Sequence, residues 1–226
     1  HRWTFPSRVQ DLGINYDGTK MLVVNCDRHI SIVDLATRKE LNALPESEAV
    51  TSICCAKHSD AMLVSISQSA PQIRLWDIGQ RRLVRKYVGH NQGRFVVRCC
   101  FGGPEERFVV SGSEDSQIYI WHRYLGSLLE VLSGHASTVN AVNWPCFSTT
   151  RPGFSLLVSA SDDHTVRIWG TAQQLRHMHR GSASMHSVPA EVRRKNNDDD
   201  NNPDNSEGTL DDLEAVGRRA DAAAAV

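Results

Sequence analysis

The sequence predicts an all-β fold built from about four copies of a four-stranded unit. Two observations carry this prediction. First, segments 32–35, 75–78, 120–122 and 168–170 are nearly the same short apolar phrase, three of them with a Trp, and the steps from Val33 to Trp76, Trp121 and Trp169 are 43, 45 and 48 residues. Second, no stretch shows a sustained helical period between caps. A repeat of about 40–45 residues that ends in Trp-Asp is typical of a β-propeller with one blade per repeat.

Short runs rich in Val, Ile, Phe and Tyr, separated by turn signals, give the expected strands in order. The clearest runs are Met21–Val24, Val50–Cys54, Met62–Ile66, Phe108–Val110, Gln117–Trp121 and Leu156–Val158. Asp17-Gly18 and segments 102–104 and 151–153 are the explicit turns. We therefore expect a propeller portion over residues 1–171, with repeat ends near residues 34, 77, 121 and 169.

Residues 172–226 have a different composition. A Ser-, Arg- and Gly-rich stretch is followed by an Asn/Asp run over 196–204 and an Ala-rich end. Such a segment has too little apolar surface to offset the entropy of ordering the chain. The sequence predicts a disordered C-terminal tail.

Bulk composition excludes several classes of function. The net charge is −1, so no overall field attracts nucleic acid or a membrane surface. No apolar run approaches the roughly 18 residues that span a bilayer. The six cysteines form no Cys-x-x-Cys pair and lie mostly in apolar runs, which predicts reduced thiols rather than disulfides or a zinc site. We expect no cofactor, no metal and no nucleic-acid partner.

The two downstream repeats share a longer motif at matching offsets. Each has a Gly-His pair, then a Ser ten residues before the Trp and an Asp six residues before it. These residues resemble WD repeats. In that family Asp, His, Ser and Trp form a hydrogen-bonded relay in which each buried polar group has a partner. The resemblance implies two such sets, Asp115–His90–Ser111–Trp121 and Asp163–His135–Ser159–Trp169.

Ser, His and Asp are also the residue types of a hydrolase triad, which is the alternative interpretation. The set occurs twice, each copy ends on a Trp, and no Gly-x-Ser-x-Gly elbow is present. No phosphate-binding glycine loop appears either. The sequence therefore predicts a structural relay and a protein that is not an enzyme.

The two upstream repeats are degenerate. Val33 stands where the Trp belongs in the first, and Trp76 is preceded by segment 68–72 rather than by a tight Asp turn. Pro71 lacks the backbone N–H that a tight hairpin turn would use. We expect these two blades to rely on apolar packing alone.

A narrower resemblance rests on the sequences around the Trp phrase. The segments that show this resemblance are 83–87, 100–103, 111–115, 118–122, 159–163 and 166–170. With them the chain resembles the C-terminal propeller repeats of the WD-repeat protein 26 family. That resemblance implies a non-catalytic scaffold subunit of a CTLH-type (GID-type) E3 ubiquitin ligase in the cytoplasm and nucleus. The implied partners are ligase subunits, substrates and, as a weaker association, G-protein βγ.

Four repeats is fewer than this family's propellers contain. The sequence therefore predicts that the chain is part of a larger ring, with the missing blades of its own full-length chain as a further partner. One side of the array should then expose a strand edge and apolar faces.

Two alternative functions stay open at this point, a substrate receptor for a cullin-4 ligase and a G-protein β-like signalling scaffold. Cullin-4 receptors tend to carry Trp-Asp-x-Arg. Trp76 is followed by Asp-Ile-Gly, Trp121 by His and Trp169 by Gly, so the motif is missing from every repeat present.

Family analogy also indicates which loop residues face a partner on the narrow side of the ring. They are Glu114, Asp162, Arg94, Thr138 and Asn140. The alternative is that these are ordinary solvated loop residues.

Overall fold

The computed structural model describes residues 1–26, 29–44, 46, 48–67, 70–144 and 156–171. Within them the chain forms fifteen β-strands and one short 3-10 segment, η1 (Pro104–Glu106). The predicted tail, residues 172–226, lies outside the described residues. Residues His1–Ile168 make up one compact unit.

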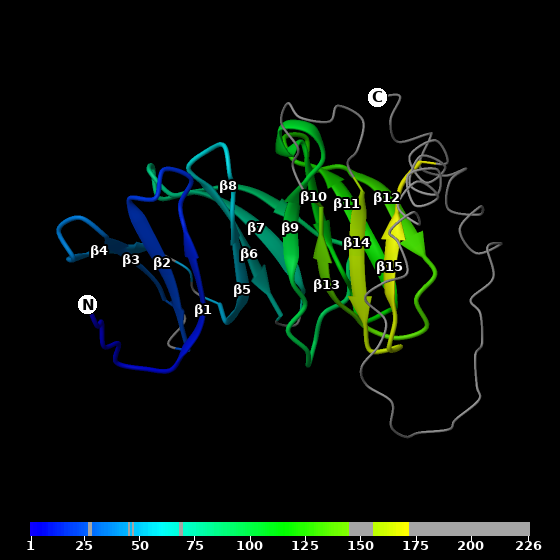
Figure 1. Cartoon of the computed structure of the whole chain (residues 1–226), viewed down its shortest axis with the longest axis horizontal. Coiled ribbons are helices and arrows are strands. Elements are labelled where there is room, and N and C mark those ends of the chain that lie inside the picture. Colours follow the sequence, from blue (N-terminus) through cyan, green and yellow to red (C-terminus); the bar gives the residue numbers. More distant parts are fainter. Residues whose placement is uncertain (27–28, 45, 47, 68–69, 145–155, 172–226) are drawn as a thin grey trace, which may run out of the picture. The chain divides into compact units, whose positions relative to one another are not determined.

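The strands form four antiparallel sheets in chain order, and each sheet is a simple meander (Figure 1). The first sheet contains β1 (Val9–Ile14), β2 (Lys20–Asn25), β3 (Ile30–Asp34) and β4 (Glu40–Leu44). The second contains β5 (Val50–Cys55), β6 (Ala61–Ile66), β7 (Gln72–Asp77) and β8 (Arg82–Tyr87). The third contains β9 (Cys99–Gly102), β10 (Phe108–Ser111), β11 (Gln117–His122) and β12 (Leu128–Ser133). The fourth, within the described residues, contains β13 (Val139–Asn143), β14 (Leu157–Ser161) and β15 (Val166–Trp169).

The four predicted blades are confirmed, and the repeated phrase has a fixed place in each. Val33, Trp76, Trp121 and Trp169 lie on the third strand of their sheets, β3, β7, β11 and β15. The first strands of successive sheets contact one another, β1 with β5, β5 with β9 and β9 with β13. This arrangement of meanders joined through their first strands is that of propeller blades.

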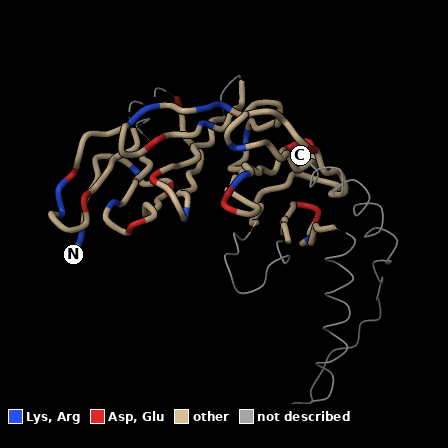
Figure 2. Tube along the Cα trace, turned by 90° about the horizontal axis from the view of Figure 1, so that it is seen from above, with Lys and Arg blue, Asp and Glu red and all other residues tan. Residues whose placement is uncertain are grey.

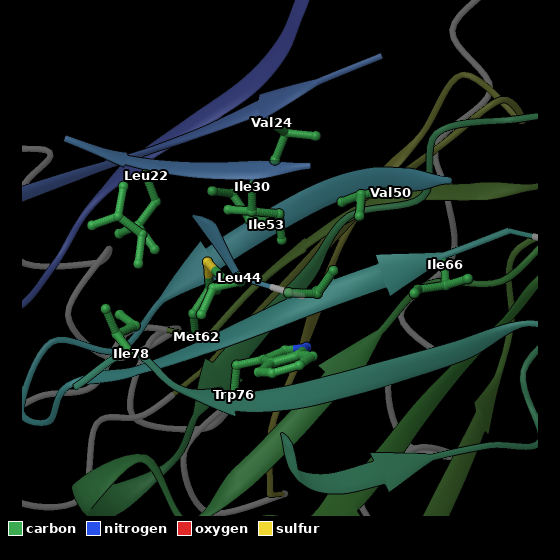
Figure 3. Packing of buried hydrophobic residues seen from close by; sticks show 12 residues of the cluster. Leu22, Val24, Ile30, Leu44, Val50, Ile53, Met62, Ile66, Trp76 and Ile78 are labelled. Atoms are coloured by element: carbon green, nitrogen blue, oxygen red, sulfur yellow. The ribbon is translucent and has the colours of Figure 1, made fainter. Parts of the chain in front are cut away.

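Alternating side chains of the middle strands supply two different cores. On β6, Met62, Val64 and Ile66 belong to a cluster shared with the first sheet (Figure 3). Leu63, between them, belongs to a cluster shared with the third sheet. Successive side chains of a strand point to opposite faces, so an unbroken apolar strand is the expected pattern when both faces are buried.

A buried carboxylate joins the second sheet to the third. Glu106 is 1% exposed, and its Oε1 accepts the Lys57 backbone N–H at 2.6 Å. Its other oxygen pairs with Arg123 at 3.3 Å, and that guanidinium donates to Ser59 Oγ at 2.7 Å. Lys57 and Ser59 lie in the β5–β6 connection, so the contact closes the space between the two sheets at this end of the strands.

Charged residues of both signs are interspersed along the chain rather than collected on one sheet (Figure 2). Large apolar side chains are exposed on the first strand of the first sheet, where Leu12 is 59% exposed, and on the last described strand, where Val166 is 69% exposed. Leu12 lies two residues from Ile14, so both point to the same face of β1. That face is more than half exposed at both positions.

Gly112 is required by a close approach of two sheets. A Cβ at this position would lie 2.1 Å from the Val139 carbonyl oxygen, a backbone atom that cannot rotate away. We expect Gly112→Ala to lower the free energy of unfolding by about 1–3 kcal/mol, as overpacking does. Gly93→Ala is the matched control because its Cβ would meet nothing closer than 3.5 Å. Urea denaturation of both variants is the measurement, and equal midpoints would contradict the close approach.

Candidate interaction face and its buried relays

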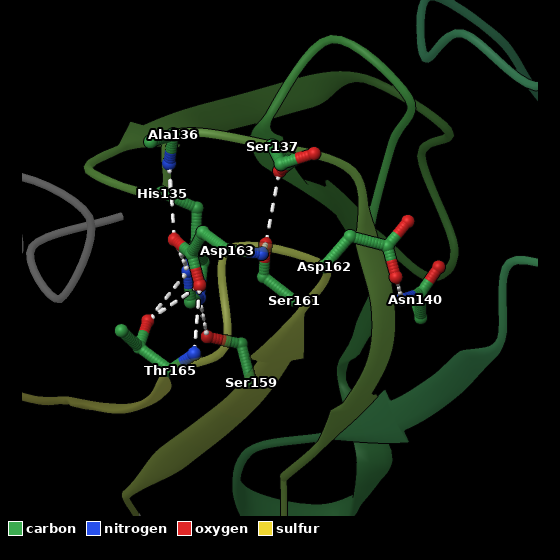
Figure 4. Close-up of polar contacts among 9 residues, drawn as sticks. All are labelled: His135, Ala136, Ser137, Asn140, Ser159, Ser161, Asp162, Asp163 and Thr165. Carbon is green, nitrogen blue, oxygen red and sulfur yellow. Dashed lines mark hydrogen bonds and ion pairs between the residues drawn. The ribbon is translucent and has the colours of Figure 1, made fainter.

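The fourth sheet brings together three members of a predicted relay (Figure 4). The His135 ring lies between two partners, with Nδ1 2.7 Å from Asp163 Oδ2 and Nε2 2.7 Å from Ser159 Oγ. Ser159 lies on β14, and Asp163 is in the turn that follows it. Trp169, the fourth predicted member, is buried on β15. The link from Ser159 to the Trp169 indole stays a prediction.

Asp163 organises this turn through several donors. The backbone N–H and hydroxyl of Thr165 donate to its Oδ1 at 2.9 and 2.7 Å, and the Ala136 N–H donates to Oδ2 at 3.0 Å. Burial on its own raises the pKa of Asp163, but the hydrogen bonds from Thr165, Ala136 and His135 outweigh it and hold that pKa well below its usual range. The carboxylate therefore remains ionised and connects the β12–β13 loop to the β14–β15 turn.

The His135 set has the distances of a hydrolase triad but not its access. Ser159 is 1% exposed and lies within a strand, whereas a nucleophile must reach a carbonyl carbon of its substrate. His135 is also buried, with its side chain fully covered. The arrangement satisfies buried polar groups, which is a structural task.

The second predicted relay, around His90, does not form, and this corrects the prediction. Neither ring nitrogen of His90 has a hydrogen-bond partner among the described residues. Ser111 Oγ donates to the Gly112 carbonyl at 2.9 Å, and Trp121 Nε1 donates to the Val88 carbonyl at 3.1 Å. The His90 ring instead packs edge-on against Trp121, with centroids 5.7 Å apart.

Tyr119 is a difference between the two sheets. Its hydroxyl donates at 2.7 Å to Asp115 Oδ2, on the carboxylate that the relay would offer to His90, and we infer that it competes with the imidazole. In the fourth sheet the equivalent position, two residues before the Trp, is Arg167, and Asp163 is left to His135. Burial disfavours the imidazolium and lowers the pKa of His90 to about 4, against smaller opposing effects of Asp115 and Gln92.

The second sheet has a polar network of its own, so the expectation of apolar packing alone was wrong there. Trp76 Nε1 donates to Glu46 Oε2 at 3.2 Å, and Arg74 forms ion pairs with Glu46 and Glu48. Glu46 and Arg74 are both buried. In this sheet the Glu46 carboxylate, from the β4–β5 connection, accepts the Trp76 indole N–H. A relay hydroxyl would accept that N–H in a complete WD repeat. The sequence shows these acidic residues, but no spacing rule links them to a Trp thirty residues later.

The five residues predicted to face a partner fall into four situations. Arg94 is exposed and has no hydrogen bond or ion pair within the described part of the chain. Asn140 and Asp162 bond each other through the amide and a carboxylate oxygen. Thr138 is 8% exposed and has little surface to offer. Glu114 Oε1 accepts two backbone N–H groups of the loop that precedes β9.

Other kinds of site are not visible in the described residues. They contain no group of three or more His, Cys, Asp and Glu side chains placed to hold a metal ion. No described helix has the length and apolarity of a transmembrane helix. The five described cysteines, Cys26, Cys54, Cys55, Cys99 and Cys100, are all unpaired. Cys146 lies outside the described residues.

Comparison with known proteins agrees with this geometry. Residues 81–122 and 126–170 match the family described as WD domain, G-beta repeat. The chain belongs to the WD-repeat family. The narrower resemblance to WD-repeat protein 26 is confirmed by relatives, of which a WD repeat-containing protein 26 homolog of Arabidopsis thaliana is 40% identical over 72% of this chain.

Two further relatives of this WD-repeat chain are informative. The WD repeat-containing protein WDS homolog of Arabidopsis thaliana is 41% identical over 75% of the chain, which covers 31% of that protein. GID complex subunit 7 of Schizosaccharomyces pombe is 39% identical over 74% of the chain, which covers 33% of it. With 26% coverage of the WD-repeat protein 26 homolog, the chain spans about a quarter to a third of these relatives.

If Tyr119 displaces His90, removing its hydroxyl should restore the relay of this WD repeat. In Tyr119→Phe, Asp115 is free to pair with the imidazolium, so we expect the pKa of His90 to rise by about one unit or more. Histidine proton shifts followed by NMR against pH measure it. Tyr124→Phe, which removes an exposed hydroxyl, is the control. A His90 pKa that remains near 4 in Tyr119→Phe would contradict the competition.

The Asp163 hydrogen bonds predict a pH-dependent contribution to stability. We expect Asp163→Asn to lower the free energy of unfolding by about 2–4 kcal/mol near pH 7, since several bonds to a charged acceptor are weakened. The pKa of Asp163 is lower in the folded state than in the unfolded chain. The stabilisation is therefore full above about pH 4 and disappears as the pH falls below it.

Urea unfolding of wild type and Asp163→Asn, compared near pH 7 and in acid, is the measurement. Asp162→Asn is the matched control because the neighbouring carboxylate is exposed and bonds only Asn140 among the described residues. If the difference in unfolding free energy between wild type and Asp163→Asn does not become smaller in acid, the ionised carboxylate is not the source of the stabilisation.

Proposed function

We propose that this WD-repeat chain belongs to a non-catalytic scaffold subunit of a CTLH-type (GID-type) E3 ubiquitin ligase. The observation that carries the proposal is the 39% identity to GID complex subunit 7 over three quarters of the chain. The WD repeat-containing protein 26 homologs of Arabidopsis thaliana and Drosophila melanogaster, at 40% and 37% identity, support the same assignment. In this role the subunit holds ligase partners and substrates together in the cytoplasm and nucleus.

The geometry supports a binding task rather than chemistry. The one Ser-His-Asp set with catalytic distances among the described residues is covered by protein. The second and third sheets, whose middle strands are buried on both faces, hold their connecting loops in place, which is how repeat scaffolds present extended binding surfaces. The exposed apolar face at Leu12 and Ile14 is a surface for the neighbouring blades of the longer protein.

The assignment predicts which proteins co-purify with the full-length protein. We expect its affinity purification from native cells to recover the catalytic subunits of a ubiquitin ligase, and its removal to lower ligase activity in the purified assembly. Quantitative mass spectrometry and an in vitro ubiquitination assay are the measurements. The control is a purification from cells in which only the tag is expressed. Recovery of cullin-4 adaptors or G-protein subunits without those ligase subunits would overturn the proposal in favour of the corresponding alternative.

A further inference from the structure

The connection between β8 and β9 contains a loop, residues 91–97, whose backbone is fixed from two sheets. Two N–H groups, of Gly93 and Phe95, donate to Glu114 Oε1 at 2.7 and 3.0 Å. Asn91 is held at both of its backbone groups by Ser113 Oγ, at 2.9 Å through its N–H and 3.1 Å through its carbonyl. The third sheet thus anchors the first half of the loop.

The second sheet anchors the other half. Gln92 is buried, and its amide donates to Thr51 Oγ1 at 3.0 Å and back to the Phe95 carbonyl at 3.2 Å. Ser52 Oγ donates to the Val97 carbonyl at 3.2 Å. With these bonds the 91–97 loop has its conformation set before any partner arrives, which removes part of the ordering cost of binding.

What the fixed loop presents to solvent is a cation beside two apolar side chains. Phe95 is 48% exposed and Val96 is 44% exposed. Arg94 is exposed and carries the only charge in residues 91–97. Arg and Phe are among the residue types that are enriched in protein–protein interfaces.

The acidic side chains around the loop keep their charge, but each is engaged in hydrogen bonds or an ion pair of its own. The Glu114 carboxylate is engaged by two backbone N–H groups, and Asp162 bonds Asn140. Asp11 is engaged by the Ile53 N–H and by Arg98. Arg94, without such a partner among the described residues, is the group left to pair with an anion.

We propose that the 91–97 loop is a docking surface for a short acidic segment of a partner protein, in which a carboxylate lies next to a Leu or Phe side chain. The carboxylate pairs with Arg94, and the apolar side chain covers Phe95 and Val96. Glu114 acts as a positioning residue that shapes the loop without touching the segment. This proposal deepens the scaffold function and rests on it for the identity of the partner as a protein.

The test uses the full-length protein and fluorescein-labelled peptides, with fluorescence anisotropy as the readout. One peptide set places one or two carboxylates beside a Leu or Phe, and a second set replaces those carboxylates with amides. A peptide of residues 196–204 of this chain is the third probe, since it carries four Asp residues without any Leu or aromatic side chain. We expect the first set to bind at least about tenfold more tightly than the other two. Equal binding of all three, or binding by none, would overturn the proposal.

Matched variants separate the contact residues from the positioning residue. Arg94→Glu and Phe95→Ala should each weaken binding of the acidic-apolar peptides about tenfold or more, with Arg94→Glu also abolishing the salt dependence. Glu114→Ala should weaken binding while the salt dependence remains. Lys86→Glu and Leu125→Ala, exposed positions on β8 and in the β11–β12 loop, are the charge and size controls. Controls that weaken binding as much as Arg94→Glu would overturn the assignment to this loop.

The outcome is distinguishable from that of the ligase assignment. Ligase subunits that co-purify with a protein to which no acidic-apolar peptide binds would leave the scaffold function standing and remove the docking surface. Peptide binding that depends on Arg94 and Phe95, with no ligase subunit recovered, would do the reverse.

Discussion

The structure depends on one constraint, that the middle strands of the second and third sheets are buried on both of their faces. The strict alternation of β6 shows it most clearly, since Met62 and Leu63 are both fully buried and yet belong to different cores. Because no face is left for polar side chains, a polar atom on a middle strand must find its partner inside the protein. That requirement, more than the hydrophobic packing itself, distinguishes one repeat of this chain from the next.

Three sheets meet the requirement in three ways. The fourth uses the imidazole of His135 between a hydroxyl and a carboxylate. The second uses Glu46, which accepts from Trp76 and neutralises Arg74. In the third, Trp121 turns to a backbone carbonyl, and His90 stays neutral in an aromatic environment. An unpaired neutral imidazole costs less to bury than an unpaired ion, so the lowered pKa of His90 is the way this sheet tolerates a missing bond.

Sequence reasoning could reach the fold because the repeat is a property of spacing. Trp76, Trp121 and Trp169 fall on third strands, and the period alone places them there. The hydrogen bonds of the two relays could not be predicted with the same certainty as the fold. Two repeats can carry the same residues at the same offsets and still pair their donors with different acceptors. Asp115 and Asp163 stand at the same offset, but Asp115 accepts from Tyr119 and Asp163 accepts from His135. Glu114 was expected at a partner surface from its position, whereas its carboxylate is engaged by N–H groups of a loop twenty residues earlier in the chain.

The hydrogen bonds to Glu114 bear on the proposed docking surface because they fix the loop before a partner binds. A loop that must order itself on binding loses affinity to entropy, and one held by its own sheet does not. The bonds that hold residues 91–97 come from Ser113 and Glu114 of the third sheet and from Thr51 and Ser52 of the second. The loop conformation therefore depends on how those two sheets pack, and Glu106 and Arg123 join the same two sheets through Lys57 and Ser59. The polar contacts below the loop and the surface above it are therefore coupled. The contacts of Gln92, Glu114 and Ser52 fix the loop backbone, and the backbone determines which side chains point to solvent.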